Sequence, residues 1–126
     1  MPVKRTIIFN HTPKCGGSTL SQILKNQFKS CSIYSYKIGC RPDDPCHLNS
    51  YPDKKKNKIR LCTGHLKFGF HKYLPHENYT YLQMFREPVD RLVSSYHYEK
   101  QRGGKRHPDI AKMNFGEFVR EDVKKG

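Results

Sequence analysis

The segment TIIFNHTPKCGGSTL, Thr6–Leu20, constrains the fold of this chain more than any other stretch. Its apolar start is rich in β-branched and aromatic residues and predicts a buried strand over Thr6–Asn10. Apolar residues then recur at helical spacing from Ser18 to about Lys29 and predict an amphipathic helix. A strand that passes through a glycine-rich turn into a helix presents backbone N–H groups at the positive end of the helix dipole. The segment therefore predicts an anion site.

The turn between this strand and this helix holds the candidate anion-binding residues. Gly16 and Gly17 let the backbone approach a phosphate closely, and Ser18 and Thr19 add hydroxyl donors. We expect Lys14 to project over the same anion. The spacing differs from the GxxxxGK[ST] of nucleotide-hydrolysing loops, which place the lysine after the glycines. The alternative is a glycine-rich turn in which Ser18 serves only as the helix N-cap.

Two further strands are predicted downstream. The polar stretch 39–58 contains prolines and a lysine cluster and predicts a surface loop. IRLCTGH, Ile59–His65, is typical of a short strand that ends in a turn, and aromatic-rich YTYLQMF, Tyr79–Phe85, predicts the next strand. Strands that alternate with helices indicate an α/β fold with a parallel sheet, and we expect one domain over residues 1–126.

Two helices are predicted in the C-terminal third. Pro88 opens the first, because the missing N–H of proline costs nothing at a helix start. The segment QRGGKRHP ends that helix. The last helix is predicted to start at Asn114, with Glu117 as its capping-box partner.

A second candidate anion contact lies in MFREPVDRLVSSYHY, Met84–Tyr98. Arg86 ends the predicted strand, and Ser94 follows inside the predicted helix. If the chain bends sharply between them, both side chains reach one phosphate, Arg86 through its planar guanidinium. The alternative is that Arg86, Asp90 and Arg91 are solvated charges at a helix start.

The charge of the chain indicates a polyanionic partner. Lys and Arg number 24 against 11 Asp and Glu, a formal net charge of +13 over 126 residues. One interpretation is a small basic nucleic-acid-binding or polyanion-binding module, although no known nucleic-acid motif is present. That module would stack bases on the aromatic residues Tyr79, Tyr81, Tyr96 and Tyr98. A basic surface without a partner is a further alternative.

The five cysteines are Cys15, Cys31, Cys40, Cys46 and Cys62. Cys15 lies inside the candidate anion loop, and the other four would form up to two bridges in an oxidising compartment. A zinc site would use Cys46-His47 and Cys62-x-x-His65. It lacks the paired CxxC spacing of strong zinc sites, so we expect no metal.

The two segments PKCGGSTL and FREPVDRLVSSY, in this order, resemble the motifs of sulfotransferases that use 3′-phosphoadenosine 5′-phosphosulfate (PAPS). The likeness is to the membrane-anchored carbohydrate branch, which includes the heparan sulfate 2-O- and 6-O-sulfotransferases. It implies a P-loop-like parallel sheet flanked by helices, the sulfotransferase fold, and sulfuryl transfer to a glycosaminoglycan-like hydroxyl. It covers only the N-terminal part of a family catalytic domain, so we expect an incomplete domain. An inactive nucleotide-binding fragment is the alternative.

The resemblance also implies roles for individual residues. Lys14 matches the family lysine that contacts the 5′-phosphosulfate and steadies charge as the S–O bond breaks. The cradle for that group would be formed by Cys15, Gly16, Gly17, Ser18 and Thr19. Arg86 and Ser94 match the pair that grips the 3′-phosphate.

A base is needed to take the proton of the acceptor hydroxyl. His65, in TGHLKFG, resembles the proposed catalytic histidine of the 2-O-sulfotransferases, and the ordinary pKa of histidine, about 6.5, suits that role. His11, beside the phosphate loop, is the second candidate. The alternative for His65 is a turn histidine bonded to a backbone carbonyl.

The acceptor implied by the resemblance is an anionic glycan rather than a nucleic acid. The basic residues that would dock it are Lys54–Lys58, Arg60, Lys100, Arg102, Lys105 and Arg106. A solvated loop is the other interpretation of Lys54–Lys56.

The compartment implied is the Golgi lumen, reached through a type II membrane anchor that this chain lacks. Asn78-Tyr79-Thr80 would then be a glycosylation sequon, whereas Asn10-His11-Thr12 runs into the phosphate loop. A soluble bacterial or viral protein is the alternative.

Overall fold

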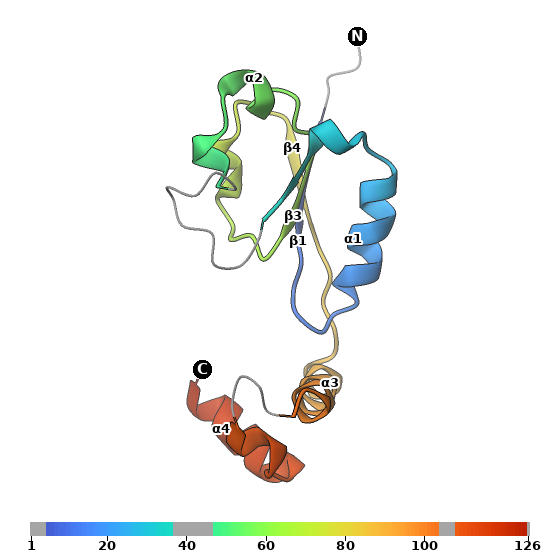
Figure 1. The fold of residues 1–126 in the computed structure, drawn as a ribbon, viewed down its shortest axis with the longest axis vertical. Helices are drawn as coiled ribbons and strands as arrows, with labels where there is room; N and C mark the ends of the chain where they lie inside the picture. Colours follow the sequence, from blue (N-terminus) through green and yellow to red (C-terminus); the bar gives the residue numbers. More distant parts are fainter. Residues whose placement is uncertain (1–4, 37–46, 104–107, 126) are drawn as a thin grey trace. The chain divides into compact units, whose positions relative to one another are not determined.

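The computed structural model describes residues 5–36, 47–103 and 108–125 (Figure 1). The chain divides into two compact units, Met1–Phe85 and Arg86–Gly126. In the described ranges no helix has the length and apolar character needed to cross a membrane. Four residues named above, Cys40, Cys46, Lys105 and Arg106, lie outside these ranges.

The first unit is built on a four-stranded sheet. Its strands are β1 (Thr6–Asn10), β2 (Ile33–Ser35), β3 (Leu61–Gly64) and β4 (Tyr79–Gln83), in the order β2-β3-β1-β4. Every neighbouring pair is parallel, which confirms the predicted α/β fold with a parallel sheet. The carboxyl ends of all four strands therefore meet at one edge, where open α/β sheets bind their ligands.

Helix α1 (Gly17–Asn26) covers one face of this sheet, and α2 (Asp53–Lys56) lies on the other side (Figure 1). The hydroxyl groups of Ser21 and Thr63 share a buried hydrogen bond of 2.9 Å that ties α1 to β3. α1 ends three residues before the predicted boundary near Lys29, because its last turn closes on Leu24 and Lys25.

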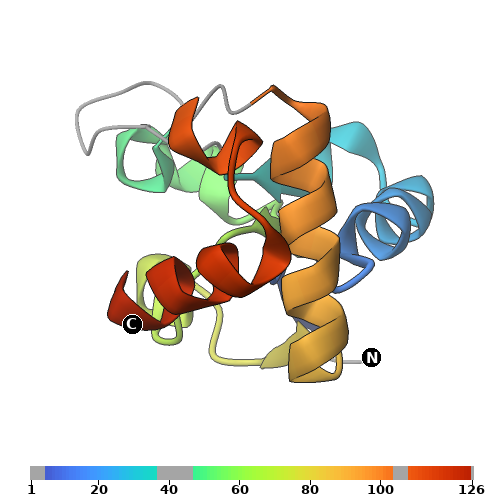
Figure 2. The same ribbon diagram turned by 90° about the horizontal axis from the view of Figure 1, so that it is seen from below.

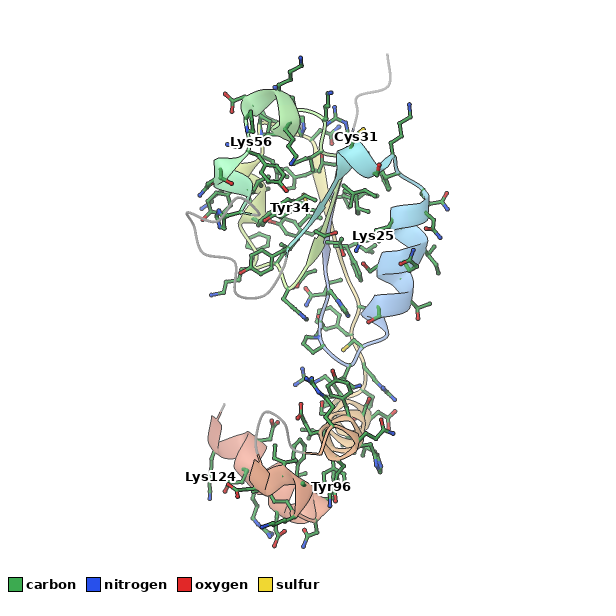
Figure 3. The ribbon with its side chains drawn as sticks, in the orientation of Figure 1. Lys25, Cys31, Tyr34, Lys56, Tyr96 and Lys124 are labelled. Atoms are coloured by element: carbon green, nitrogen blue, oxygen red, sulfur yellow. The ribbon has the colours of Figure 1, made fainter. Side chains whose placement is uncertain are left out.

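The main hydrophobic core lies on the face opposite α1. It consists of Ile8, Tyr34, Leu48, Ile59, Cys62, Leu66 and Leu74. Figure 3 shows the Tyr34 side chain on that face, where its ring stacks on Phe70 at 5.6 Å. Burial raises the pKa of the Tyr34 hydroxyl to about 12, and burial likewise raises the pKa of the Cys62 thiol to about 12.

The described part of the predicted surface loop 39–58 is more ordered than the prediction. It contains a short 3₁₀ helix, Leu48–Ser50, and the helical turn α2. Leu48 is fully buried, since its side chain completes the core beneath β2 and β3.

The second unit pairs α3 (Pro88–Gln101) with α4 (Phe115–Lys125), joined through the 3₁₀ helix Pro108–Ala111 (Figure 2). Tyr96 on α3 packs against Phe115 and Phe118 with ring centroids 5.5 Å apart in each pair.

Both predicted helix starts in this unit are confirmed. Pro88 is the first residue of α3, and the side chain of Glu87 accepts the N–H of Asp90 at 2.9 Å. Asn114 and Glu117 form the reciprocal capping box at the start of α4, with N···O distances of 2.8 and 3.0 Å.

Candidate functional site

The strand register aligns three residues across the carboxyl edge of the sheet. Asn10, the last residue of β1, pairs with Gly64 of β3 on one side and with Gln83 of β4 on the other. The segments that follow Asn10 and Gly64 therefore start side by side. They are the loop after β1 and the turn that carries His65.

The loop after β1 has the shape of an anion cradle. Its backbone is left-handed at Lys14, with φ of 61°, and at Gly16, with φ of 76°. Gly16 is the N-cap of α1 and provides no side-chain hydrogen bond to the first turn. The first turn of α1 therefore directly follows this loop, and the amides at a helix start are suited to binding an anion.

The structure corrects the alternative interpretation of Ser18. Ser18 is not the N-cap, because α1 already begins at Gly17. Ser18 and Thr19 are exposed in the first turn, where their hydroxyl groups and amides can meet a ligand. Cys15 is only 5% exposed, so we expect its backbone amide rather than its thiol to contribute to the cradle.

Gln83 holds the loop from the neighbouring strand. Its side-chain amide donates to the hydroxyl of Thr12 at 3.0 Å. This contact joins the end of β4 to the loop after β1. The sequence contains no local signal for Gln83, because the contact depends on the order of strands in the sheet.

His11 and His65 form a stacked pair, with ring centroids 5.2 Å apart and planes 15° apart. The distance is close to the spacing of neighbouring strands, because each histidine directly follows one member of the Asn10–Gly64 pair. The backbone N–H of His11 also donates to the carbonyl of Gly64 at 2.7 Å. The structure thus brings together the two histidines that the sequence left as alternatives.

Two glycines, Gly17 and Gly64, allow close contacts next to this pair. A Cβ at Gly17 would collide with the imidazole of His11. Gly64 has φ of +140°, and a Cβ there would lie 2.9 Å from the carbonyl oxygen of Tyr36. Gly17 is therefore required by its contact with His11, and Gly64 by its backbone conformation and its contact with Tyr36.

A pocket of about 430 Å³ opens beside His65. Its aromatic lining is formed by Tyr36, Phe68, Phe70 and Tyr73. The described residues that line it include two lysines, Lys67 and Lys72, and two histidines, His47 and His65, but no acidic side chain. The size lies in the range of small-molecule sites, and the lining suits an anionic ligand with a flat apolar face.

Tyr81 of β4 anchors the segment that forms this pocket wall. Its hydroxyl oxygen accepts the backbone N–H groups of Gly69 and His71, each at 3.1 Å. With both lone pairs occupied, the hydroxyl donates its proton to Nδ1 of His71 at 2.9 Å. The ring of His71 also stacks on Tyr79 at 4.3 Å. No local sequence pattern indicates that Tyr81 anchors this wall, because its partners lie ten and twelve residues away.

The second candidate anion contact, Arg86 with Ser94, belongs to the second unit. Arg86 is exposed and begins that unit, directly after the last residues of the β4 segment. Ser94 is half-buried on α3. The first unit therefore holds Lys14, the glycine cradle and His65, and the second unit holds Arg86 and Ser94.

Several of the predicted docking cations make contacts within their own unit. The ammonium of Lys55 lies 3.6 Å from the centre of the Tyr51 ring, and Arg60 is 2.7 Å from Nε2 of His76. Lys100 donates to the carbonyl of Ala111 at 3.0 Å. Lys54 and Lys58 are exposed.

The cysteines that the structure describes are free thiols: Cys15, Cys31 and Cys62. In the described ranges no group of three or more His, Cys, Asp or Glu side chains is arranged to hold a metal ion. The zinc alternative also names Cys46, which lies outside those ranges.

A family model described as the sulfotransferase family matches residues 2–125. The chain belongs to the sulfotransferase family. Neither the curated proteins nor the solved structures that were compared gave a match. The all-parallel sheet flanked by helices is consistent with the sulfotransferase fold, and membership assigns the chain to transferases that move a sulfuryl group.

Proposed function

We propose that this sulfotransferase moves the sulfuryl group of PAPS to a hydroxyl of an anionic, glycosaminoglycan-like carbohydrate, as in the heparan sulfate branch. One observation carries the proposal: the glycine loop that opens α1 and the turn that holds His65 follow neighbouring strands at one sheet edge. A donor cradle and a base are thus available on the same side of the fold.

The residues of the loop after β1 fit the charged end of the donor. PAPS, when bound, supplies the sulfuryl group and a phosphate leaving group. The amides of Gly17, Ser18 and Thr19 can bind its 5′-phosphosulfate at the positive end of α1. Lys14 can stabilise the negative charge that develops on the bridging oxygen. Arg86 and Ser94 are proposed to bind the 3′-phosphate.

His65 is proposed to act as the general base. As the acceptor oxygen forms its bond to sulfur, the S–O bond to the 5′-phosphate breaks, and the acceptor proton moves to His65. 3′-Phosphoadenosine 5′-phosphate leaves with the electron pair of the broken bond, and Lys14 offsets its charge. The residues contribute alignment and electrostatic stabilisation.

The pocket beside His65 supports an anionic sugar as the acceptor. Aromatic rings such as Phe68, which is 86% exposed, provide flat apolar surfaces for a pyranose. Lys67 and Lys72 provide positive charge for a carboxylate or sulfate group on that sugar. The net charge of +13 supports recruitment of a longer polyanion.

The first test is calorimetric binding of 3′-phosphoadenosine 5′-phosphate, with 5′-AMP as the comparison ligand. We expect saturable binding that requires the 3′-phosphate and weakens at least tenfold in Lys14→Ala and in Arg86→Ala. Lys29→Ala is the matched control, because Lys29 is an exposed lysine that follows the opposite end of α1. Equal affinity for both nucleotides in folded protein would contradict the donor assignment, and salt-sensitive binding of DNA instead would favour the polyanion module.

We also propose that this protein works in the Golgi lumen and is glycosylated at Asn78. Asn78 directly precedes β4, which is one of the two outermost strands of the sheet. Expression with a secretory leader in cultured cells should give a species that glycosidase shortens, and Asn78→Gln should abolish that shift. Thr12→Val is the control for the sequon at Asn10, and a glycosidase shift that survives in Asn78→Gln would contradict the assignment.

A further inference from the structure

The imidazole of His11 is partly buried and lies against residues of three different segments of the first unit. It is near-parallel to the ring of Phe9 on β1, with centroids 6.2 Å apart and planes 13° apart. It is also near-parallel to His65 after β3. Gly17, the first residue of α1, meets its Cδ2 and Nε2 edge so closely that no side chain fits there. His11 is thus the contact between the phosphate cradle and His65.

The surroundings of His11 favour its uncharged form. Burial lowers the pKa of His11, and the positive charges of His65 and of Lys25 on α1 lower it further. On the side of β4, the side chain that contacts the loop after β1 is that of Gln83, which is neutral. His11 is therefore uncharged near neutral pH, whereas two charged imidazoles at 5.2 Å would repel each other.

We propose that His11 is a positioning residue for His65: its ring, which lies against Phe9 and Gly17, holds the base beside the cradle by stacking. This inference rests on the proposed role of His65 as the base. It assigns the two histidines different tasks, where the sequence offered them as alternatives. During the reaction the proton of the acceptor would be taken by His65, and a charge on His11 would oppose that step.

The test begins with proton NMR titration of the histidine ring signals between about pH 4.5 and 9, which needs no enzymatic activity. Three variants separate stacking from charge: His11→Phe keeps a ring that cannot titrate, His11→Gln removes the ring, and His11→Arg fixes a positive charge. We expect His11→Arg to lower the titration midpoint of His65 by about one to two pH units, and His11→Phe to leave it within about 0.3 units. The ring signal of His71, whose side chain contacts Tyr79 and Tyr81, reports whether each variant is folded.

The second readout is the pH profile of kcat/KM for sulfuryl transfer to a heparin-derived oligosaccharide. The acid limb should move with the His65 midpoint in His11→Arg. His11→Gln should lose about tenfold in kcat with an unchanged KM for PAPS, and His11→Phe should recover part of that loss. A His65 midpoint that does not respond to His11→Arg in folded protein would overturn the inference, as would equal kcat in His11→Gln and the parent.

The two proposals fail in different ways. If His11→Arg shifts the His65 midpoint while no acceptor is sulfated, the coupling of the pair stands and the proposed reaction fails. If transfer requires His65 but is indifferent to His11, the reaction stands and the positioning role is refuted. His65→Ala measures that requirement directly.

Discussion

Replacing Tyr81 with phenylalanine removes one oxygen atom that organises the pocket wall beside His65. The hydroxyl makes three contacts, with the amides of Gly69 and His71 and with Nδ1 of His71. Each such hydrogen bond contributes about 0.5–1.5 kcal/mol net, and the amides are only partly buried, so water replaces some of the loss. We expect Tyr81→Phe to lower the free energy of unfolding by about 2 kcal/mol. For a unit of this size that is a fall in Tm of about 10 °C.

Thermal melts followed by circular dichroism measure the global effect, and hydrogen exchange of the Gly69 and His71 amides measures the local one. Both amides should exchange faster in Tyr81→Phe. Tyr79→Phe is the matched control, since Tyr79 lies on the same strand and contacts His71 through its ring. We expect that control to change stability by less than about 0.5 kcal/mol. Equal melting of the two variants, with unchanged exchange at Gly69 and His71, would refute this account of the pocket wall.

Three further predictions follow from contacts around the sheet. Gly17→Ala should cost about 1–3 kcal/mol and displace His11, seen as a shifted His11 ring signal, because the added methyl overlaps the imidazole; an unshifted signal would contradict this contact. With iodoacetamide at pH 8, exposed Cys31 should react quickly and Cys62 only after unfolding, because burial raises the pKa of Cys62 to about 12. Equal labelling rates of the two thiols in native protein would contradict this prediction. Burial lowers the pKa of His11 in the folded protein below its ordinary 6.5. As pH falls, His11 therefore becomes protonated in the unfolded chain before it does in the folded protein. The free energy of unfolding should then decrease as pH drops below about 6.5. His11→Phe should flatten that decline in urea melts, and an identical decline in both proteins would remove His11 as its cause.

Local sequence patterns were sufficient for most elements of the fold. The β-branched run before Asn10 predicted β1, Pro88 predicted the start of α3, and the pair Asn114 and Glu117 predicted the cap of α4. Strand β2 was missed, because its three residues Ile33–Ser35 are too short to show an alternating pattern. Its strand character comes from pairing with β3 along the sheet edge.

The candidate site was predictable as a set of residues but not as an arrangement. Glycines and a lysine after a strand predicted the cradle, and a histidine after another strand predicted the base. That His11 and His65 stack on each other depends on β1 and β3 being neighbours in register, which no local pattern specifies. For the same reason Tyr81 was not foreseen as the anchor of the pocket wall.

The aromatic residues also bear on the nucleic-acid alternative. Tyr79 and Tyr81 pack against the core and His71, and Tyr96 packs against Phe118 and donates to the carbonyl of Met113 at 3.0 Å. Rings engaged in this way are poor platforms for stacked bases. This observation favours the transferase proposal over a base-stacking module.

The pairing of Asn10 with Gly64 has a consequence for how this protein can change over evolution. One residue inserted within β1 would turn the side chain of His11 to the opposite face of the sheet, and the pair with His65 would be lost even though every residue of the motif remained. We therefore expect homologues to vary in length between the strands, while the strands themselves keep a fixed count of residues ahead of each histidine.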